Sequence, residues 1–279
     1  MQQINFNFLW ESMLLVLLGS VLLTAPGGGL LPGAAHFKKG VGGGGNCGDL
    51  DKGGLDTVTW WYDWGHDANG FAQCNGTSPL YAEYVPMIWG KWATSNVTAT
   101  VADIRKLGKV RYLFGFNEPD HSGSWEDPVD AAKRWPNMER IADALNVTLI
   151  SPCVSNYQSG LWWLDTFRAA FKNATGRSPR MDHMCLHAYT SDAKSVMNTL
   201  EAMNRTYNRP IWVNEFACPP YKGCTSPNQL KFMKAILPLL EESPLVYRYA
   251  WFDQTNFIVS LYYMTEYFIN LMRKCNEYI

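Results

Sequence analysis

Residues 112–120 read YLFGFNEPD, an apolar run that ends in a carboxylate. Because Pro119 cannot continue the interior of a sheet, this run predicts a strand with Glu118 at its carboxyl end. Residues 210–216, PIWVNEF, repeat the arrangement and put Glu215 at the end of a second strand. Two strands of one chain therefore end in an Asn-Glu pair.

Similar apolar runs alternate with helical patterns on both sides of these two strands. Val196, Leu200, Met203 and Tyr207, for example, form one helical stripe. The predicted strands are residues 58–62, 83–89, 112–116, 148–151, 181–187, 210–214 and 246–251, with a weaker candidate at 39–41, where glycines follow. Alternation of strands and helices predicts a parallel sheet, and about eight units in about 250 residues favour a compact (β/α)8 TIM-type barrel of the α/β class over an open sheet.

The composition narrows the class of protein. Hydrophobic residues make up 47% of the 279 residues and aromatic residues 14%, which excludes disorder for most of the chain. The net charge of −1 gives no electrostatic footprint for nucleic acid or for an anionic membrane surface. The 12 Trp and 14 Tyr residues indicate either a large core or a groove lined with flat rings that suits sugars.

The amino-terminal residues indicate secretion. Residues 13–25 are apolar, too short to span a bilayer, and typical of a signal-peptide core, although Glu11 precedes them and no Lys or Arg does. We therefore expect a signal peptide at 1–25, a flexible Gly-rich leader at 26–37 and one barrel domain at 38–279. Five N-x-Ser/Thr triplets support a secreted glycoprotein. They begin at Asn75, Asn96, Asn146, Asn173 and Asn204.

Secretion also permits disulfide bonds among the seven cysteines. Cys218 and Cys224 bracket a short Pro/Gly loop, and we predict a disulfide between them. The odd number leaves at least one thiol unpaired or paired between chains.

The two strand-end glutamates predict a chemistry. Active sites of parallel barrels form at the carboxyl ends of the strands, and these are the fourth and seventh strands, on opposite sides of the barrel mouth. Glycoside hydrolysis needs two such carboxyl groups, one to protonate the leaving oxygen and one to attack the anomeric carbon or activate water. The alternative is that each glutamate pairs with a cation, for which Arg111 and Arg248 are candidates.

These motifs, with several others, resemble glycoside hydrolase family 128, which comprises secreted β-1,3-glucanases of clan A with a (β/α)8 barrel and a retaining mechanism. The resemblance covers about residues 38–252. The similar segments are KKGV at 38–41, WWYDWG at 60–65, EYVPMIWG at 83–90, GFNEPD at 115–120, WLDTF at 163–167, HAY at 187–189, PIWVNEF at 210–216 and YRYAWF at 247–252.

The resemblance implies roles for individual residues. Glu118 would be the general acid/base and Glu215 the nucleophile, while Asn117 would hold the sugar 2-hydroxyl. His187 and Tyr189 would shape the groove near the nucleophile. The remaining residues implied in substrate binding are the stacking platforms Trp89, Trp163 and Trp251, with Tyr62 and Trp64 as further candidates.

A retaining mechanism predicts a carboxyl separation of ~5–5.5 Å between Glu118 and Glu215. Mutual repulsion and partial burial would raise the pKa of Glu118 so that it stays protonated. We expect no cofactor and no metal, because His183 and His187 lie in a predicted strand whose four-residue span of ~13 Å prevents them from sharing an ion. The pattern G-x-G-x-x-G at 40–45 has neither the strand nor the helix of a nucleotide site.

The expected partner is a β-glucan polysaccharide or oligosaccharide, bound by a secreted, extracellular or cell-wall monomer with no stable membrane span. Residues 253–279 depart from the family pattern and form a divergent tail. Two alternatives remain at this stage. One is a non-catalytic glucan-binding barrel, and the other is a clan A hydrolase acting on a β-1,4-linked glycan.

Overall fold

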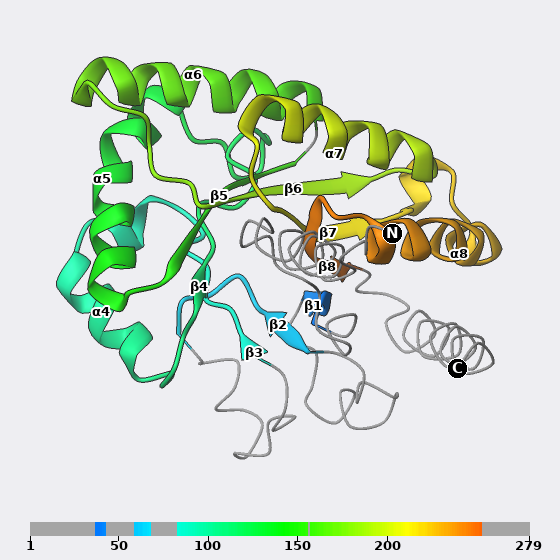
Figure 1. Ribbon diagram of the computed structural model, residues 1–279, viewed down its shortest axis with the longest axis horizontal. Coiled ribbons are helices and arrows are strands. Elements are labelled where there is room, and N and C mark those ends of the chain that lie inside the picture. Colours follow the sequence, from blue (N-terminus) through cyan, green and yellow to red (C-terminus); the bar gives the residue numbers. More distant parts are fainter. Residues whose placement is uncertain (1–36, 43–58, 68–82, 156, 253–279) are drawn as a thin grey trace, which may run out of the picture. The chain divides into compact units, whose positions relative to one another are not determined.

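The structure is a computed structural model that describes residues 37–42, 59–67, 83–155 and 157–252. Eight parallel strands form one sheet, in the order β3-β2-β1-β8-β7-β6-β5-β4 (Figure 1). A parallel bridge between Met87 and Phe114 joins the chain after β3 to the chain after β4, so the predicted barrel closes and is confirmed. The strands are β1 (Lys39–Gly42), β2 (Trp60–Tyr62), β3 (Glu83–Tyr84), β4 (Tyr112–Leu113), β5 (Thr148–Val154), β6 (His183–Tyr189), β7 (Ile211–Ala217) and β8 (Val246–Trp251).

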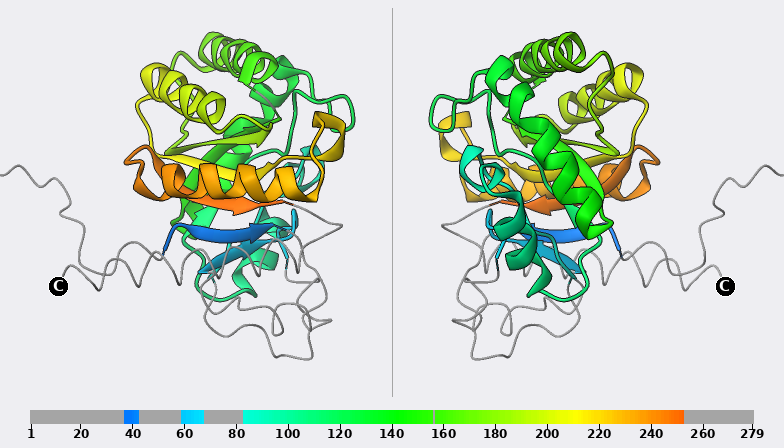
Figure 2. Two further views of the ribbon diagram at one scale, coloured as in Figure 1. Left: turned by 90° about the vertical axis from the view of Figure 1, so that its right-hand side faces the viewer. Right: turned by 90° about the vertical axis from the view of Figure 1, so that its left-hand side faces the viewer.

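Helices connect the strands from β3 onward and lie outside the sheet (Figure 2). They are η3 (Lys91–Thr94), α4 (Val97–Arg105), α5 (Pro128–Leu145), α6 (Tyr157–Thr175), α7 (Ala193–Tyr207), η4 (Pro220–Lys222) and α8 (Ser226–Glu242). Local sequence explains the start of α5, where Asp127 accepts hydrogen bonds from the backbone of Val129 and Asp130 and Pro128 occupies the first turn. The segments that follow β1 and β2 lie outside the described residues.

Two apolar layers lie on the two faces of the sheet. Inward-pointing side chains such as Trp60, Phe114 and Trp212 fill the barrel, and a second cluster packs the outer face against the helices. Trp163 on α6 and Trp251 on β8 belong to the outer cluster, with 0% and 2% of their surfaces exposed. The prediction that these two rings stack on sugars is therefore wrong, because packing between sheet and helices covers them.

The two arginines considered as partners for the strand-end glutamates bind another carboxylate. Arg111 Nη2 lies 2.7 Å from Glu83 Oε2, and Arg248 Nη2 lies 2.8 Å from the same oxygen. Glu83 is the first residue of β3, at the opposite end of the barrel from the strand tips. Neither arginine is therefore the partner of Glu118 or Glu215.

Two disulfides link described residues. The predicted bond between Cys218 and Cys224 is confirmed, and a second bond, which the sequence did not reveal, joins Cys153 on β5 to Cys185 on β6. Cys47, Cys74 and Cys275 lie outside the described residues.

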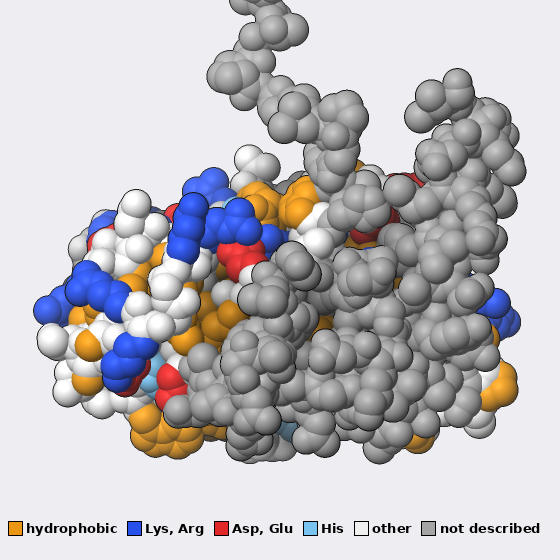
Figure 3. Space-filling model, turned by 90° about the horizontal axis from the view of Figure 1, so that it is seen from below, with side chains coloured by type: hydrophobic (Ala, Val, Ile, Leu, Met, Phe, Trp, Pro, Cys, Tyr) orange, Lys and Arg blue, Asp and Glu red, His pale blue; other side chains and the backbone are white. Residues whose placement is uncertain are grey.

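The predicted signal peptide, most of the leader and the divergent tail also fall outside the part of the chain that the structure describes. Within that part, no helix combines the length and apolar character needed to cross a membrane. Figure 3 shows one face of the molecule, on which basic, acidic and apolar side chains are interspersed where grey atoms do not cover it.

Substitution of Gly115 tests the close packing between β5 and the chain that follows β4, which positions Glu118. A Cβ atom at Gly115 would lie 2.8 Å from the backbone nitrogen of Pro152 and 2.9 Å from the backbone of Ser151, so β5 would have to move. We predict that Gly115→Ala lowers the free energy of unfolding by about 1–3 kcal/mol, measured by urea denaturation. Gly90→Ala is the matched control, because its Cβ meets no atom within 4 Å and a change below about 0.5 kcal/mol is expected. Equal stability of both variants would contradict this packing.

Candidate active site

A strained backbone holds Glu118 at the barrel mouth. Its φ of 43° is left-handed, which is uncommon for a residue with a side chain and more so before a proline. Hydrogen bonds fix this conformation: the Glu118 amide donates to Cys153 O at 2.7 Å, and its carbonyl accepts from the His121 amide at 2.9 Å and from Ser124 Oγ at 2.6 Å. The strain is thus offset by three bonds.

A bulge in β7 orients Glu215. Strand β7 continues to Ala217, so Glu215 lies inside the strand rather than at its tip as predicted. The pairing with β6 shifts register between Leu186 and His187, and His187 pairs with Glu215 instead of Asn214. Strict alternation from inward-facing Trp212 would turn Glu215 away from the barrel interior. The extra residue at the bulge lets the Glu215 carboxylate face the mouth.

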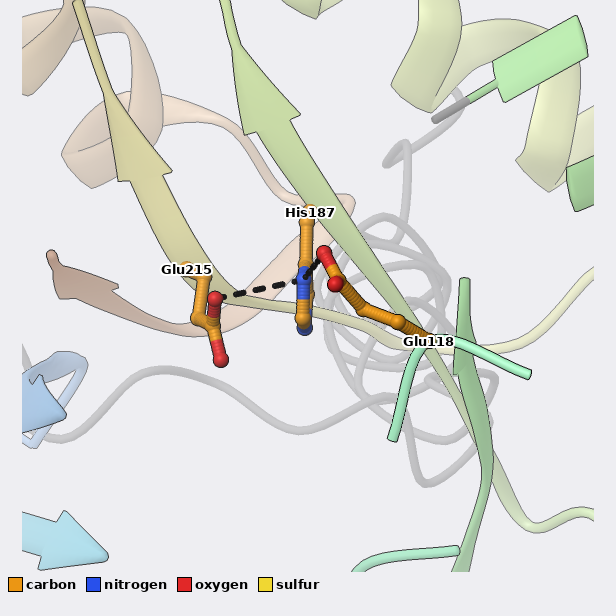
Figure 4. Close-up of side chains that lie close together, drawn as sticks. All are labelled: Glu118, His187 and Glu215. Carbon is orange, nitrogen blue, oxygen red and sulfur yellow. Dashed lines mark hydrogen bonds and ion pairs between the residues drawn. The ribbon is translucent and has the colours of Figure 1, made fainter. Parts of the chain in front are cut away.

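His187 on β6 lies between the two carboxylates (Figure 4). Its Nδ1 atom is 2.8 Å from Glu118 Oε1 and 3.3 Å from Glu215 Oε2. One ligand atom from each of the three residues lies within 4.8 Å of the other two. A single imidazole N–H therefore contacts both glutamates, which are close enough to act on one atom between them.

Three further donors surround the Glu215 carboxylate. Tyr62 OH donates to Oε1 at 2.9 Å and Trp64 Nε1 donates to the same oxygen at 2.8 Å. Tyr189 OH donates to Oε2. Burial and the nearby Glu215 charge raise the pKa of both tyrosines, so they remain protonated donors. Donors to both oxygens fix the orientation of the Glu215 carboxylate.

The pKa values of His187 and Glu118 shift in opposite directions, each toward the charged form of the group. Burial lowers the pKa of His187, but the Glu215 charge and the hydrogen bond and charge of Glu118 outweigh it and raise that pKa above 6.5. Burial raises the pKa of Glu118, but the hydrogen bond and charge of His187 and the charge of His121 bring it below 4.5. The predicted rise in the pKa of Glu118 is therefore wrong, because the sequence did not reveal the cation beside it.

These groups open into a pocket of about 670 Å³. Most of the predicted site residues meet here, including Trp64 and Trp89 on its walls, whereas Tyr62 lies beneath them and contacts Glu215. Tyr221 and Lys222, which were not predicted from the sequence, line the wall on the loop closed by the Cys218–Cys224 disulfide. Their position just after the strand carrying Glu215 was the available signal. The lining residues include Trp64, Trp89, Asn117, Glu118, His121, Ser155, Tyr189, Glu215, Tyr221, Lys222, Gln229 and Phe252.

Glu118, His187 and Glu215 are also the described residues whose donor atoms could together ligate a cation. The hydrogen bonds of His187 account for their closeness without one. The expectation that no metal or cofactor takes part stays a prediction.

The family model for the glycosyl hydrolase catalytic core matches residues 46–268. An endo-β-1,3-glucanase of family 128, subgroup II, from Pseudomonas viridiflava is 27% identical, with a TM-score of 0.64 over 77% of this chain and 86% of that one. A subgroup I endo-β-1,3-glucanase from Amycolatopsis mediterranei, solved as a glutamate-to-alanine variant with laminaripentaose, is 30% identical. Its TM-score is 0.61 over 77% of this chain and 88% of that one. The chain therefore belongs to the glycosyl hydrolase catalytic core family and, within it, to glycoside hydrolase family 128.

Among curated proteins, alkali-sensitive linkage protein 1 of Schizosaccharomyces pombe is 27% identical over 204 residues. The match includes 70% of this chain and 34% of the relative, so the chain spans about a third of that protein's length. The protein is a glycoside hydrolase by family, and the fold and pocket agree with this class.

The charge state of His187 can be measured directly. We predict an apparent pKa above 6.5 for His187 in ¹⁵N-imidazole NMR titrations, and a lower one in Glu118→Gln, because that variant removes the negative charge that accepts the imidazole proton. His183 is an internal control, since burial lowers its pKa to about 4. Because the pKa of His187 is raised, its contribution to folding stability is present below pH 6.5 and is lost as the pH rises through the folded-state pKa. Titration of His187 below 6.5 would contradict the bridging role.

Proposed function

We propose that the protein is a β-1,3-glucanase that works by a retaining double displacement, with Glu118 as general acid/base and Glu215 as nucleophile. The observation that carries the proposal is the single His187 imidazole in contact with both carboxylates. This contact leaves room for one anomeric carbon between the glutamates, whereas an inverting enzyme needs space for a water as well.

In the first step, a Glu215 oxygen attacks the anomeric carbon while the bond to the leaving glycosidic oxygen breaks. Glu118 gives its proton to that oxygen, and a covalent glycosyl-enzyme forms. Tyr62, Trp64 and Tyr189 fix the orientation of the Glu215 carboxylate before attack. In the second step, ionised Glu118 takes a proton from water, the water oxygen bonds to the anomeric carbon, and Glu215 leaves.

The acidic proton of the first step comes from the His187–Glu118 pair. In the unliganded site the imidazole carries it, 2.8 Å from Glu118 Oε1. Transfer along this hydrogen bond gives neutral His187 and protonated Glu118 without changing the net charge of the site. A bound sugar excludes water from the pocket, and a drier pocket favours the neutral pair over the ion pair.

The proposed preference for β-1,3-linked glucan is supported by similar proteins of known structure. The Amycolatopsis mediterranei endo-β-1,3-glucanase was crystallised with laminari-oligosaccharides after either of two glutamates was replaced by alanine. Those two glutamates are separated along that chain by as many residues as separate Glu118 and Glu215 here. The equal spacing supports the same pair of roles and a β-1,3-glucan substrate.

Asn117 and two tryptophans supply the proposed contacts to the sugar. Asn117 Oδ1 is buried and has no hydrogen-bond partner within the described part of the chain, so it can accept a hydrogen bond from a sugar hydroxyl such as the 2-hydroxyl. Trp64 and Trp89 line the pocket, where indole rings pack on the C–H faces of sugars.

We also propose that the protein is exported and acts outside the cell as a monomer. Two disulfides support an oxidising compartment. Asn96, Asn146 and Asn173 of the N-x-Ser/Thr triplets are exposed, as glycan acceptors must be.

Replacement of the two glutamates tests the mechanism. We predict that Glu118→Ala lowers kcat on laminarin by about 10²–10⁴-fold and Glu215→Ala lowers it further. With an activated aryl β-laminaribioside, azide should rescue both variants, giving a β-glycosyl azide from Glu118→Ala and an α-glycosyl azide from Glu215→Ala. Glu201→Ala, on the exposed surface of α7, is the control and should retain parental activity.

Activity on a panel of substrates distinguishes the proposed function from the two alternatives that the sequence leaves open. Parent protein that cleaves carboxymethyl-cellulose but not laminarin would indicate a β-1,4-specific enzyme. Folded parent that binds laminarin without releasing sugar would indicate a glucan-binding barrel and would refute the proposal.

A further inference from the structure

A second pocket lies beside the catalytic pocket, on the far side of Trp89. Its volume is about 410 Å³, and Trp89 lines both pockets. The chain after β3 and the chain after β4 form its walls, so it lies on the face of the barrel that carries Glu118. Glu118, Glu215 and His187 do not line this second pocket.

Its walls carry two tryptophans with unusually large exposed surfaces. Trp92 on η3 is 67% exposed and Trp125 is 53% exposed. Burying such large rings in the core would have stabilised the fold, so their exposure next to a pocket indicates a binding surface. The rings of Trp89 and Trp92 are parallel, with an interplanar angle of 3° and centroids 5.5 Å apart. At that distance parallel rings are stacked with an offset, so each partly covers one face of the other, and together they form a stepped apolar surface between the two pockets.

The second pocket carries charged groups of both signs. Lys91 and Arg134 line it together with Glu126, Asp127 and Asp130. Arg134 is paired with Glu126, and Asp130 with Lys133. Because Glu126 and Asp130 are already paired with cations and Asp127 caps α5, a charged ligand would gain little here, whereas a neutral ligand rich in hydroxyl groups finds both donors and acceptors around apolar rings.

We propose that this second pocket is an outer glucan-binding subsite. It would hold further sugar units of the same glucan molecule whose scissile bond lies between Glu118 and Glu215, with Trp92 and Trp125 as the stacking surfaces. The proposal rests on the proposed glucanase function. A polymer that occupies the catalytic pocket must continue past its rim, and the Trp89–Trp92 pair is an apolar route from there to the second pocket. The subsite would therefore favour long chains over short ones.

The test is the dependence of activity on chain length in two variants, Trp92→Ala and Trp125→Ala. For each, kcat/KM is measured on laminarihexaose and on laminaritriose. We expect the ratio of the two values to fall about three- to tenfold in each variant, because the longer chain alone reaches the outer rings. Trp125→Ala is the more informative of the two, since Trp92 also contacts Trp89.

Trp162→Ala is the matched control. Trp162 is 57% exposed on α6 and lines neither pocket, so its loss should leave the ratio at the parental value. An unchanged ratio in both Trp92→Ala and Trp125→Ala, or an equal fall in Trp162→Ala, would overturn the outer subsite while leaving the glucanase function standing.

Failure of the proposed function gives a different result, because the parent would then cleave neither oligosaccharide. In that case the outer subsite is tested by binding alone. Titration calorimetry compares the affinity for laminarihexaose of the Glu215→Gln protein with that of the double variant Glu215→Gln/Trp125→Ala. Weaker binding by the double variant supports the outer subsite, and equal binding overturns it.

Discussion

The contact of one imidazole with two carboxylates is the constraint on which the site depends. Without His187, two glutamates this close would repel one another, and one of them would have to take up a proton. With it, Glu118 and Glu215 lie on either side of one N–H group, at 2.8 and 3.3 Å. In the proposed mechanism, His187 holds the catalytic proton one hydrogen bond away from Glu118.

The barrel keeps this arrangement in place through local strain and cross-links. Glu118 and Trp64 both have left-handed backbones, with φ of 43° and 62°, and each directs a side chain toward the site. The Cys153–Cys185 disulfide joins β5 to β6 directly below, and Cys153 also accepts the backbone hydrogen bond of Glu118. The β7 bulge then sets Glu215 opposite His187. Replacing any of these elements would move a carboxylate relative to the imidazole.

Much of the fold and the identity of the two glutamates could be predicted from the sequence, because periodicity and strand-end patterns are local. Residues 246–251 form β8 as predicted, and the Pro/Gly loop between Cys218 and Cys224 is closed by its disulfide. The features that could not be predicted depend on which face of the sheet a side chain lies on and on which strands are paired. Trp163 and Trp251 face the helices, the bulge at Glu215 changes the alternation, and Cys153 meets Cys185 only through strand pairing. The pKa of Glu118 depends on the position of His187, 69 residues away in the chain.

The stereochemistry of hydrolysis distinguishes the proposed retaining mechanism from an inverting one. The short approach of Glu118 and Glu215 through His187 favours a covalent intermediate and therefore retention. In ¹H NMR spectra taken within the first minutes of laminarihexaose cleavage, we expect the β-anomer of the new reducing end to appear first and the α-anomer to follow by mutarotation. Initial appearance of the α-anomer would contradict the double displacement, because it requires water rather than Glu215 to attack the anomeric carbon.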